Sequence, residues 1–568
     1  MILENSSDSH KELVQKFSAI VGGENVASTL KELEQITAGL IPERNHSPIA
    51  VYPKTKEEII KIVHLANEQN LHLWTVGRGN NWGYGSRMAN SPGNILVILE
   101  RMNRIHHVDE ELAYAVIEPG VSQEQLYNYL QEHHPKLWMD CTDSTPLGSV
   151  LGNALERGVG YTPYGDHFGC LCGLEVVLAS GEVLETGGGP QSCATFHTYR
   201  WGVGPVVDGL FSQSNLGIVT KGGIFLMPAP SHHNFFVCEL YNQESLGEFI
   251  SELRNLMLSG TIGNIHCLND NLVLASRMPY PYDLRGEAKR LSDEQLKELS
   301  VKEGVAPWTL VCGTYGSSLE VFFRRRVVKK ALKRFGRVQF FSETAQSLLC
   351  RLVLRIDSYD PKSIMRKILT QTLEKFSGHS LKVIRGLTGC FGYQKGIPGK
   401  YLVSTAVYYK NRKGKPEDRL TPIKDGCGLL WLAIAFPSTT QHIDLLRQMC
   451  KDKFDDYQVE FIAALVSLNP RSMILAMPIY YDKTDKEEVG RVKALYDEVI
   501  SSSRKMGYLQ YRTSVLGMKT VLENSPVFSN LCREIKMSLD PNAVFAPGKY
   551  GIETRDKTQD EMTNCHEK

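Results

Sequence analysis

The sequence lacks the features that would place the protein on nucleic acid or in a membrane. Its 64 lysines and arginines are balanced by 63 aspartates and glutamates, so the net charge of +1 provides no basic field for nucleic acid. The longest apolar run, residues 429–436, is far shorter than the roughly 20 residues that cross a bilayer. The N-terminus has no basic or apolar part of a secretory signal. We expect no nucleic-acid partner and no membrane partner.

An ordered cysteine pattern is also missing. The thirteen cysteines are odd in number and scattered, and none of them form a CxxC pair. This spacing gives no zinc site and is typical of reduced thiols. We therefore predict a cytoplasmic protein without a bound metal.

What the sequence does have is an uneven distribution of glycine. Of the 48 glycines, 23 lie within residues 77–223, about a quarter of the chain. Glycine permits tight turns and a close approach of the backbone to a ligand. This region is therefore where a binding site is expected first.

The pattern of predicted helices and strands changes along the chain and indicates where domains begin and end. At roughly 150 residues per domain, 568 residues predict two to four domains. Up to about residue 232, predicted strands at 73–76, 95–99 and 114–118 accompany helices that begin at capping-box patterns, Thr55 with Glu58 and Ser122 with Gln125. Residues 174–185 predict a hairpin. Helical patterns then lengthen, which predicts a second domain at 233–503, a helix and short loop in 504–556, and a flexible tail at 557–568. A basic cluster at 324–330 is typical of a solvated helix face.

Four stretches carry residues suited to a polar ligand. Residues 77–86 (GRGNNWGYGS) expose N–H groups that can hold a pyrophosphate, although the Rossmann spacing is absent and a plain tight loop is the alternative. Residues 148–169 are glycine-dense, with an irregular packed loop as the alternative, and residues 212–221 (SQSNLGIVTK) offer Ser, Asn and Gly. Tyr511 and Arg512 are ordinary surface residues unless other phenol hydroxyls join them around an anion.

In this order, the four stretches resemble the vanillyl-alcohol oxidase and p-cresol methylhydroxylase family of flavoproteins. The segments GSVLGNALERGVGYTPYGDH, GPVVDGLFSQSNLGIVTK and DPNAVFAPGKYG carry the resemblance, which extends from about residue 49 to 551. It implies an α+β protein with a two-segment FAD-binding domain, residues 1–232 (PCMH-type core about 41–230) and 504–556. Residues 233–503 would form a cap, or substrate, domain over the flavin ring.

The resemblance also implies which loops bind FAD. The first stretch matches the family's pyrophosphate loop, and the second and third would run along the flavin. The cofactor-binding residues it implies are Gly77, Arg78, Gly79, Asn80, Asn81, Ser149, Gly152, Asn153, Gly160, Tyr161, Gly165, Gly217 and Ile218.

The mode of FAD attachment departs from the family. In the oxidase branch a cap-domain histidine links to the flavin, and the matching position here is Gly428. No tyrosine stands near Leu420, where the methylhydroxylase branch attaches its flavin, and His442 matches poorly. We therefore predict tightly bound, non-covalent FAD. Another active-site histidine of the family falls near Ile474 or Leu475, where the stretch here is apolar.

Some of the residues with which the family binds its substrate have matches in this sequence. Tyr84, Tyr511 and Arg512 match the two tyrosines and the arginine that bind a para-substituted phenol as phenolate. Three donors, one cationic, lower the pKa of the phenol. The resemblance implies that a benzylic hydride then leaves to flavin N5, and that the resulting quinone methide takes up water or isomerises.

Two acidic positions complete the family comparison. Asp143 matches an aspartate of the family that can act as a base, and Asp140 is the second candidate for that position. The alternative is that the aspartate caps the loop. Glu417 lies near a cap-domain glutamate of the family, in a stretch that resembles an exposed turn.

These observations predict an FAD-dependent oxidase or dehydrogenase acting on a para-hydroxybenzylic or related phenolic substrate. A non-phenolic biosynthetic intermediate is the alternative substrate. A flavin-binding protein without turnover is a second alternative, which the complete Tyr-Tyr-Arg set argues against. The resemblance implies oxygen or an external acceptor such as a cytochrome as electron acceptor, and a homodimer or larger assembly.

Overall fold

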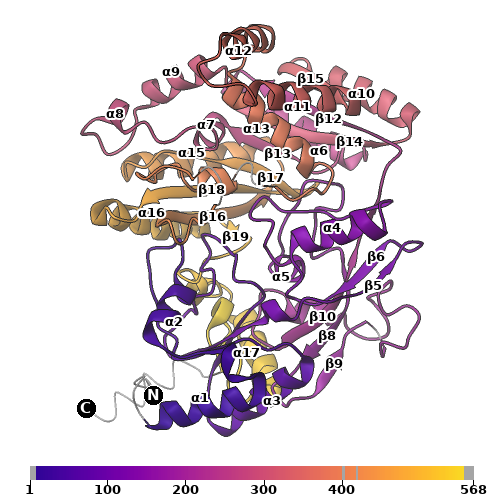
Figure 1. Ribbon diagram of the computed structural model, residues 1–568, viewed down its shortest axis with the longest axis vertical. Helices are drawn as coiled ribbons and strands as arrows, with labels where there is room; N and C mark the ends of the chain where they lie inside the picture. Colours follow the sequence, from indigo (N-terminus) through magenta and orange to yellow (C-terminus); the bar gives the residue numbers. More distant parts are fainter. Residues whose placement is uncertain (1–7, 188, 400–402, 417–419, 555–568) are drawn as a thin grey trace.

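The computed structural model describes residues 8–187, 189–399, 403–416 and 420–554, in two halves stacked along the long axis (Figure 1). The first 230 residues form most of the lower half. One of its sheets has the order β1-β2-β4-β3, and a second, antiparallel sheet has the order β5-β6-β10-β8-β9. The strands are β1 Val26–Ala27, β2 Ala50–Val51, β3 Leu73–Val76, β4 Ile95–Ile98, β5 Ile105–Asp109, β6 Tyr114–Ile117, β8 Leu171–Val177, β9 Val183–Glu185 and β10 Ile218–Phe225, with a ribbon of β7 Leu137–Trp138 and β11 Met227–Pro228.

Five helices accompany these sheets. They are α1 Asp8–Val21, α2 Leu30–Thr37, α3 Lys56–Glu68, α4 Gln123–His133 and α5 Val150–Leu155. The predicted strands at 73–76, 95–99 and 114–118 are confirmed as β3, β4 and β6, within one residue at each end. The predicted hairpin is confirmed as the antiparallel pair of β8 and β9, whose turn contains Gly181 at φ +85°.

An antiparallel sheet of eight strands forms the centre of the upper half. Its order is β15-β12-β14-β13-β17-β18-β16-β19. The strands are β12 His232–Leu240, β13 His266–Asn269, β14 Trp308–Gly316, β15 Gly336–Ser342, β16 Cys427–Pro437, β17 Ala464–Asn469, β18 Ser472–Asp482 and β19 Leu509–Gln510.

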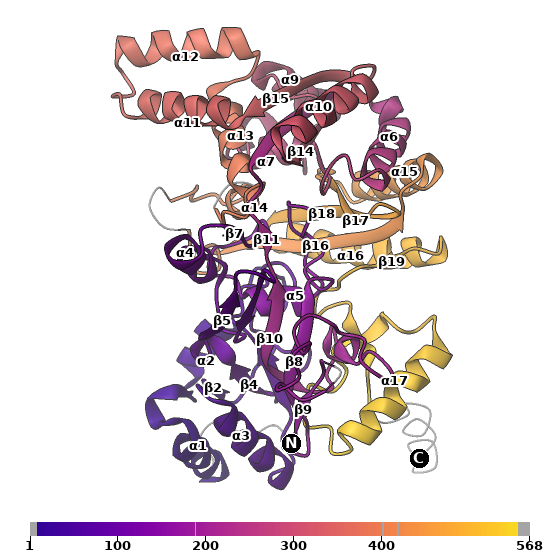
Figure 2. The same cartoon turned by 90° about the vertical axis from the view of Figure 1, so that its right-hand side faces the viewer.

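Helices cover this sheet and extend above it (Figures 1 and 2). They are α6 Leu246–Leu258, α7 Asp270–Ala275, α8 Tyr282–Arg285, α9 Asp293–Glu303, α10 Ser318–Leu332, α11 Glu343–Asp357, α12 Ile364–Ser377, α13 Leu381–Tyr393, α14 Val403–Ala406, α15 Thr440–Asp456 and α16 Lys486–Lys505. The predicted basic cluster lies on α10, where Arg325, Arg326, Lys329 and Lys330 are exposed. Among the described residues, no helix is both long and apolar enough to cross a membrane.

The two faces of the large sheet have different neighbours, because side chains alternate along a strand. On β16, Leu430, Leu432 and Ile434 enter the core that contains residues of α15 and α16. The intervening Trp431 and Ala433 point to the opposite face, toward the lower half. That second face forms the upper wall of the site described below.

The end of the chain returns to the lower half through α17 Pro526–Leu539 (Figure 2). The Leu73 N–H donates to Val544 O at 2.7 Å, and the Ala546 N–H donates to Leu73 O at 2.9 Å. The buried Lys536 ammonium donates to the carbonyls of Asn215 and Phe545 at 2.7 and 2.8 Å. These bonds fasten the last segment beside the glycine-dense loops.

Candidate active site

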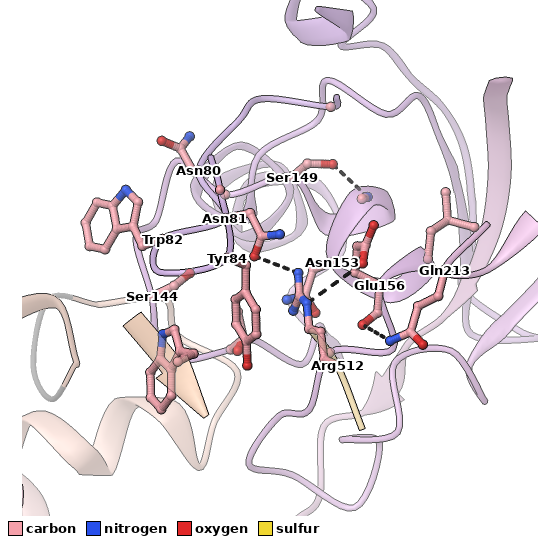
Figure 3. A pocket seen from close by; sticks show the side chains of 18 of the residues that line it. Asn80, Asn81, Trp82, Tyr84, Ser144, Ser149, Asn153, Glu156, Gln213 and Arg512 are labelled. Atoms are coloured by element: carbon pink, nitrogen blue, oxygen red, sulfur yellow. Dashed lines mark hydrogen bonds and ion pairs between the residues drawn. The ribbon is translucent and has the colours of Figure 1, made fainter. Parts of the chain in front are cut away.

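A cavity of about 320 Å³ separates the loops of the lower half from the exposed face of the large sheet (Figure 3). All four stretches identified in the sequence reach it. Strands β13, β16, β17 and β18 supply its other wall. Residues from both ends of the chain therefore meet around one space.

The loop that follows β3 turns tightly along this cavity. Gly79, Gly83 and Gly85 have φ values of +69°, +73° and +132°, which side-chain-bearing residues rarely adopt. The Arg78 guanidinium donates to Leu147 O at 2.8 Å and to Gly120 O at 3.0 Å, so its side chain ties the loop to its neighbours.

The second stretch begins with a capped helix. The Ser149 hydroxyl accepts from the Gly152 N–H at 2.8 Å, which caps α5, and donates to Pro119 O at 2.6 Å. A Cβ on Gly77 would lie 3.0 Å from this hydroxyl, so glycine there lets the first loop approach the helix. Asn153 Oδ1 lies 2.6 Å from His167 Nδ1.

The structure gathers most of the predicted cofactor residues in one place. The predicted residues that line the cavity are Gly77, Arg78, Gly79, Asn80, Asn81, Ser149, Gly152, Asn153, Tyr161, Gly217 and Ile218. Gly160 and Gly165 do not line it. They form a turn in which the Gly160 N–H donates to Gly165 O at 2.9 Å, and a Cβ on Gly165 would lie 2.5 Å from Gly160 O. These two glycines shape the loop that presents Tyr161.

The predicted substrate residues also meet at the cavity. The Arg512 guanidinium carbon lies 4.6 Å from the ring centroid of Tyr84, and its Nη2 donates to Asn81 Oδ1 at 2.7 Å. Its Nε lies 3.9 Å from Glu156 Oε2. Tyr511 lines the same cavity and lies close enough to Tyr84 to contribute to the raised pKa of its phenol. A cation and two phenol hydroxyls therefore converge, as Figure 3 shows for Tyr84 and Arg512.

Burial and neighbouring groups shift the pKa values of Tyr84 and Arg512. Burial is the main cause that raises the pKa of Tyr84 well above its usual value, Tyr511 adds to it, and Arg512 opposes it. Burial lowers the pKa of Arg512, but Tyr511 and Glu156 outweigh it and hold that pKa above its usual value. Tyr84 is thus a neutral donor beside a permanent cation.

A stack of three rings occupies another part of the site. The ring of Tyr161 lies 3.8 Å from that of His266 and 4.8 Å from that of Tyr393, both nearly parallel. The hydroxyls of Tyr161 and Tyr393 donate to the Asp143 carboxylate at 3.4 and 2.9 Å. Burial raises the pKa of Tyr161 and of Tyr393 and lowers the pKa of His266 to about 3.

The structure separates the two candidate aspartates. Asp143 lines the cavity, whereas Asp140 does not. The Asp140 carboxylate accepts from the backbone N–H groups of Cys141, Tyr161 and Thr162 and so caps the loop. Loop capping is the alternative role considered for Asp143, and in the structure Asp140 has that role.

Of the upper-half residues compared with functional positions of the family, some line the cavity and others do not. Gly428 does not line the cavity, and a Cβ there would lie 2.4 Å from Tyr481 O. His442 Nδ1 lies 2.7 Å from the Tyr508 hydroxyl, outside the cavity, whereas the apolar Ile474 lines it. Glu417 lies outside the described residues.

Several residues of the site carried no usable signal in the sequence. Glu156 and Gln213 belong to stretches already singled out but were not themselves chosen, although both line the cavity. Trp431 stacks beside Tyr84 with nearly parallel rings 6.3 Å apart. His266 comes from a strand whose sequence gave no indication of a site, and on β16 the comparison with the family singled out Gly428 but not Trp431.

Comparisons with known proteins find relatives along nearly the whole chain. A family model described as an FAD binding domain matches residues 47–187. The chain is 30% identical over 550 residues to the 4-cresol dehydrogenase (hydroxylating) flavoprotein subunit of Pseudomonas putida, covering 95% of each chain. It is also 30% identical over 541 residues to the 1'-carboxy-chondrochloren decarboxylase of Chondromyces crocatus, covering 94% of this chain and 96% of that one.

Solved structures share the whole architecture. p-Cresol methylhydroxylase with substrate bound superposes with a TM-score of 0.83 at 27% identity, over 98% of this chain and 100% of that one. A 4-ethylphenol oxidase from Gulosibacter chungangensis in complex with isoeugenol has the same fold, with a TM-score of 0.82 at 24% identity over 97% and 99% of the two chains.

Proposed function

Because the chain belongs to the p-cresol methylhydroxylase-type family of FAD-dependent oxidoreductases, we propose that it oxidises a para-substituted phenol at the benzylic carbon. The observation that carries the proposal is the convergence of Tyr84, Tyr511 and the buried Arg512 on the cavity. Two relatives at equal identity are named for different reactions, so the phenol rests on these three residues.

The residues present fit the FAD cofactor. Seven glycines line the cavity, and their missing side chains leave the backbone of three loops open to a ligand: Gly77, Gly79, Gly85, Gly148, Gly152, Gly158 and Gly217. Successive backbone N–H groups in such loops make favourable surroundings for phosphate groups. When bound, FAD supplies a two-electron acceptor for hydride.

The three substrate residues stabilise the anionic form of a phenol. The Arg512 guanidinium supplies a fixed positive charge, and the hydroxyls of Tyr84 and Tyr511 donate hydrogen bonds to the phenolate oxygen. Each interaction favours the charged form and lowers the pKa of the bound phenol. Because the donors are already held in a buried site, they need no rearrangement when negative charge develops there.

Asp143 serves as the base in this proposal. Its carboxylate lines the cavity, and the hydroxyls of Tyr161 and Tyr393 hold both of its oxygens. An aspartate held in this way accepts a proton from the water that adds to the oxidised product. The two tyrosines position the carboxylate.

Non-covalent FAD is part of the same proposal. The residues of β16 that point into the cavity are Trp431 and Ala433, which offer no nucleophile to the flavin. Acid precipitation of the yellow holoenzyme should therefore release flavin into the supernatant. Flavin retained in the pellet would contradict non-covalent binding.

The electron acceptor is proposed from the relative alone. The Pseudomonas putida protein is named as a flavoprotein subunit, which supports an assembly in which a separate subunit accepts electrons. Comparing reoxidation by oxygen with reoxidation by an added one-electron acceptor distinguishes an oxidase from a dehydrogenase.

Anaerobic mixing tests the phenol. We expect 4-hydroxybenzyl alcohol or 4-alkylphenols to bleach the flavin absorbance of the holoenzyme. Arg512→Ala should abolish bleaching while FAD stays bound, and Arg326→Ala, on the exposed face of α10, should leave it unchanged. Absence of bleaching across the panel, or unchanged rates in Arg512→Ala, would overturn the proposal.

A further inference from the structure

His266 is a buried side chain on the cavity wall without a hydrogen-bond partner. It is 5% exposed, and it lines the cavity from the first residue of β13. Among the described residues, no group bonds to either ring nitrogen, and Nδ1 is fully buried. Nδ1 is closed off even from the cavity, so a ligand in the cavity can reach this imidazole only at Nε2.

The large sheet sets the separation between His266 and the phenol-binding residues. Strands β13, β17, β18 and β16 are neighbours in that order. Three strand spacings therefore separate β13 from β16, a distance of roughly 14 Å. Tyr511 lies just beyond β16, where its N–H donates to Ala433 O.

The wall between these two ends is short and apolar. His266 pairs across the strands with Val466, which pairs with Ile474. In the neighbouring row, Ala464 pairs with Ala476, which pairs with Ala433. All five apolar residues line the cavity, so the wall suits a ring and an aliphatic chain and offers no hydrogen bond on the way.

The His266 imidazole itself offers no positive charge to an anion. Burial holds the pKa of its ring near 3, so the imidazole is neutral at ordinary pH. Its ring stacks on Tyr161, whose hydroxyl points to the Asp143 carboxylate. The neutral imidazole therefore supplies no positive charge to a ligand carboxylate, which is costly to bury without one.

We propose that His266 binds an uncharged hydrogen-bonding group, such as a hydroxyl, at the far end of the substrate's para substituent. This inference rests on the proposed function and narrows its substrate class. The substrate is then a phenol whose para chain is long enough to cross the apolar wall and bears a polar terminus. The imidazole recognises that terminus, whereas Tyr84, Tyr511 and Arg512 recognise the phenol.

Binding of unreactive phenol ethers tests this assignment without turnover. An ether oxygen at the para position leaves no benzylic hydrogen to remove. We would titrate the holoenzyme and follow the perturbed flavin spectrum with two matched pairs, 4-(2-hydroxyethoxy)phenol against 4-propoxyphenol and 4-(3-hydroxypropoxy)phenol against 4-butoxyphenol. The wild-type protein should bind the hydroxyl member of at least one pair roughly tenfold more tightly.

Variants connect that preference to the imidazole. His266→Phe keeps a ring against Tyr161 but removes both nitrogens, so the preference should fall to about one. His266→Gln keeps a donor and an acceptor and should retain part of it. Ile474→Val, a matched change on the apolar wall, should weaken both members of a pair equally.

Three results would overturn the assignment. Equal affinity within both pairs, or a preference that persists in His266→Phe, removes His266 from substrate binding while the proposed function stands. Tighter binding of 4-hydroxyphenoxyacetate than of the hydroxyl ether would show that the terminus is an anion. If no ether perturbs the flavin spectrum, the phenol proposal fails and this assignment fails with it.

Discussion

Arg512 lies across the ring of Tyr84, with its guanidinium carbon 4.6 Å from the ring centroid. The two residues come from opposite ends of the chain, and Asn81 and Glu156 hold the guanidinium from other sides. A cation over a phenol ring is stabilised by the ring's negative face, more so where water is excluded. The positive charge is therefore in place before a ligand arrives.

Removal of the Tyr84 hydroxyl should separate the role of the ring, which lies beneath Arg512, from the role of the hydroxyl as a hydrogen-bond donor. Tyr84→Phe keeps the ring beneath Arg512 but loses one donor to the phenolate. We expect the rate of flavin reduction by a 4-alkylphenol to fall by about 100-fold, as for loss of one donor to a developing oxyanion. Stopped-flow absorbance measures it. Tyr114→Phe on β6 is the control, and equal rates in Tyr84→Phe and wild type would contradict the assignment.

Local signals in the sequence predicted local structure well. The N-caps at Thr55 and Ser122 are confirmed, because each hydroxyl accepts from the N–H three residues later. The reciprocal half of each capping box is absent. The Glu58 carboxylate accepts from the Lys54 N–H, and the Gln125 amide donates to Asn103 O. The side chain that closes a capping box has other partners that only the fold brings near.

The wall supplied by the large sheet could not be predicted in this way. His266 becomes a cavity residue because β13 pairs with β17, which lies about 200 residues later in the chain. On β16, a shift of one residue decides whether Gly428 or its neighbour points to the flavin side. The structure turns Trp431 to that side, and no pattern within the apolar run determines this.

A side chain at Gly79 should weaken FAD binding. Its φ is +69°, and a Cβ would lie 2.0 Å from the Arg87 side chain. An L-residue in this conformation costs about 1–2 kcal/mol, so we expect Gly79→Ala to raise the FAD dissociation constant roughly tenfold. Fluorescence titration of the apoprotein measures it. Gly93→Ala, at φ +86° in open space off the cavity, is the matched control, and identical constants would contradict a role for this loop.

The buried pair of Lys536 and Asp540 should be essential for the C-terminal segment. Both side chains are fully buried, with Nζ 2.5 Å from the carboxylate. Lys536→Met leaves the Asp540 charge without its cation, which typically costs 3–5 kcal/mol. We expect a lower melting temperature and earlier release of FAD in thermal scans. Lys536→Met with Asp540→Asn should lose less than the single variant, and a single variant as stable as wild type would contradict this role.

The contact between His379 and Glu239 should make stability depend on pH. His379 Nε2 lies 3.1 Å from Glu239 Oε1, and this hydrogen bond is the main cause that raises the pKa of His379. The folded protein therefore holds the proton more tightly than the unfolded chain. The stabilisation is fully present below the unfolded pKa of about 6.5 and is lost as the pH rises through the higher folded pKa.

Glu239→Gln removes the charge that holds this proton. We expect it to cost about 2 kcal/mol near pH 6, where the histidine is charged, and less as the pH rises through the folded pKa and the histidine loses its proton. The melting temperatures of wild type and variant should thus converge as the pH rises. His379→Gln should flatten the same dependence. A difference that is constant between pH 6 and pH 9, or that widens, would mean that this pair does not hold the proton.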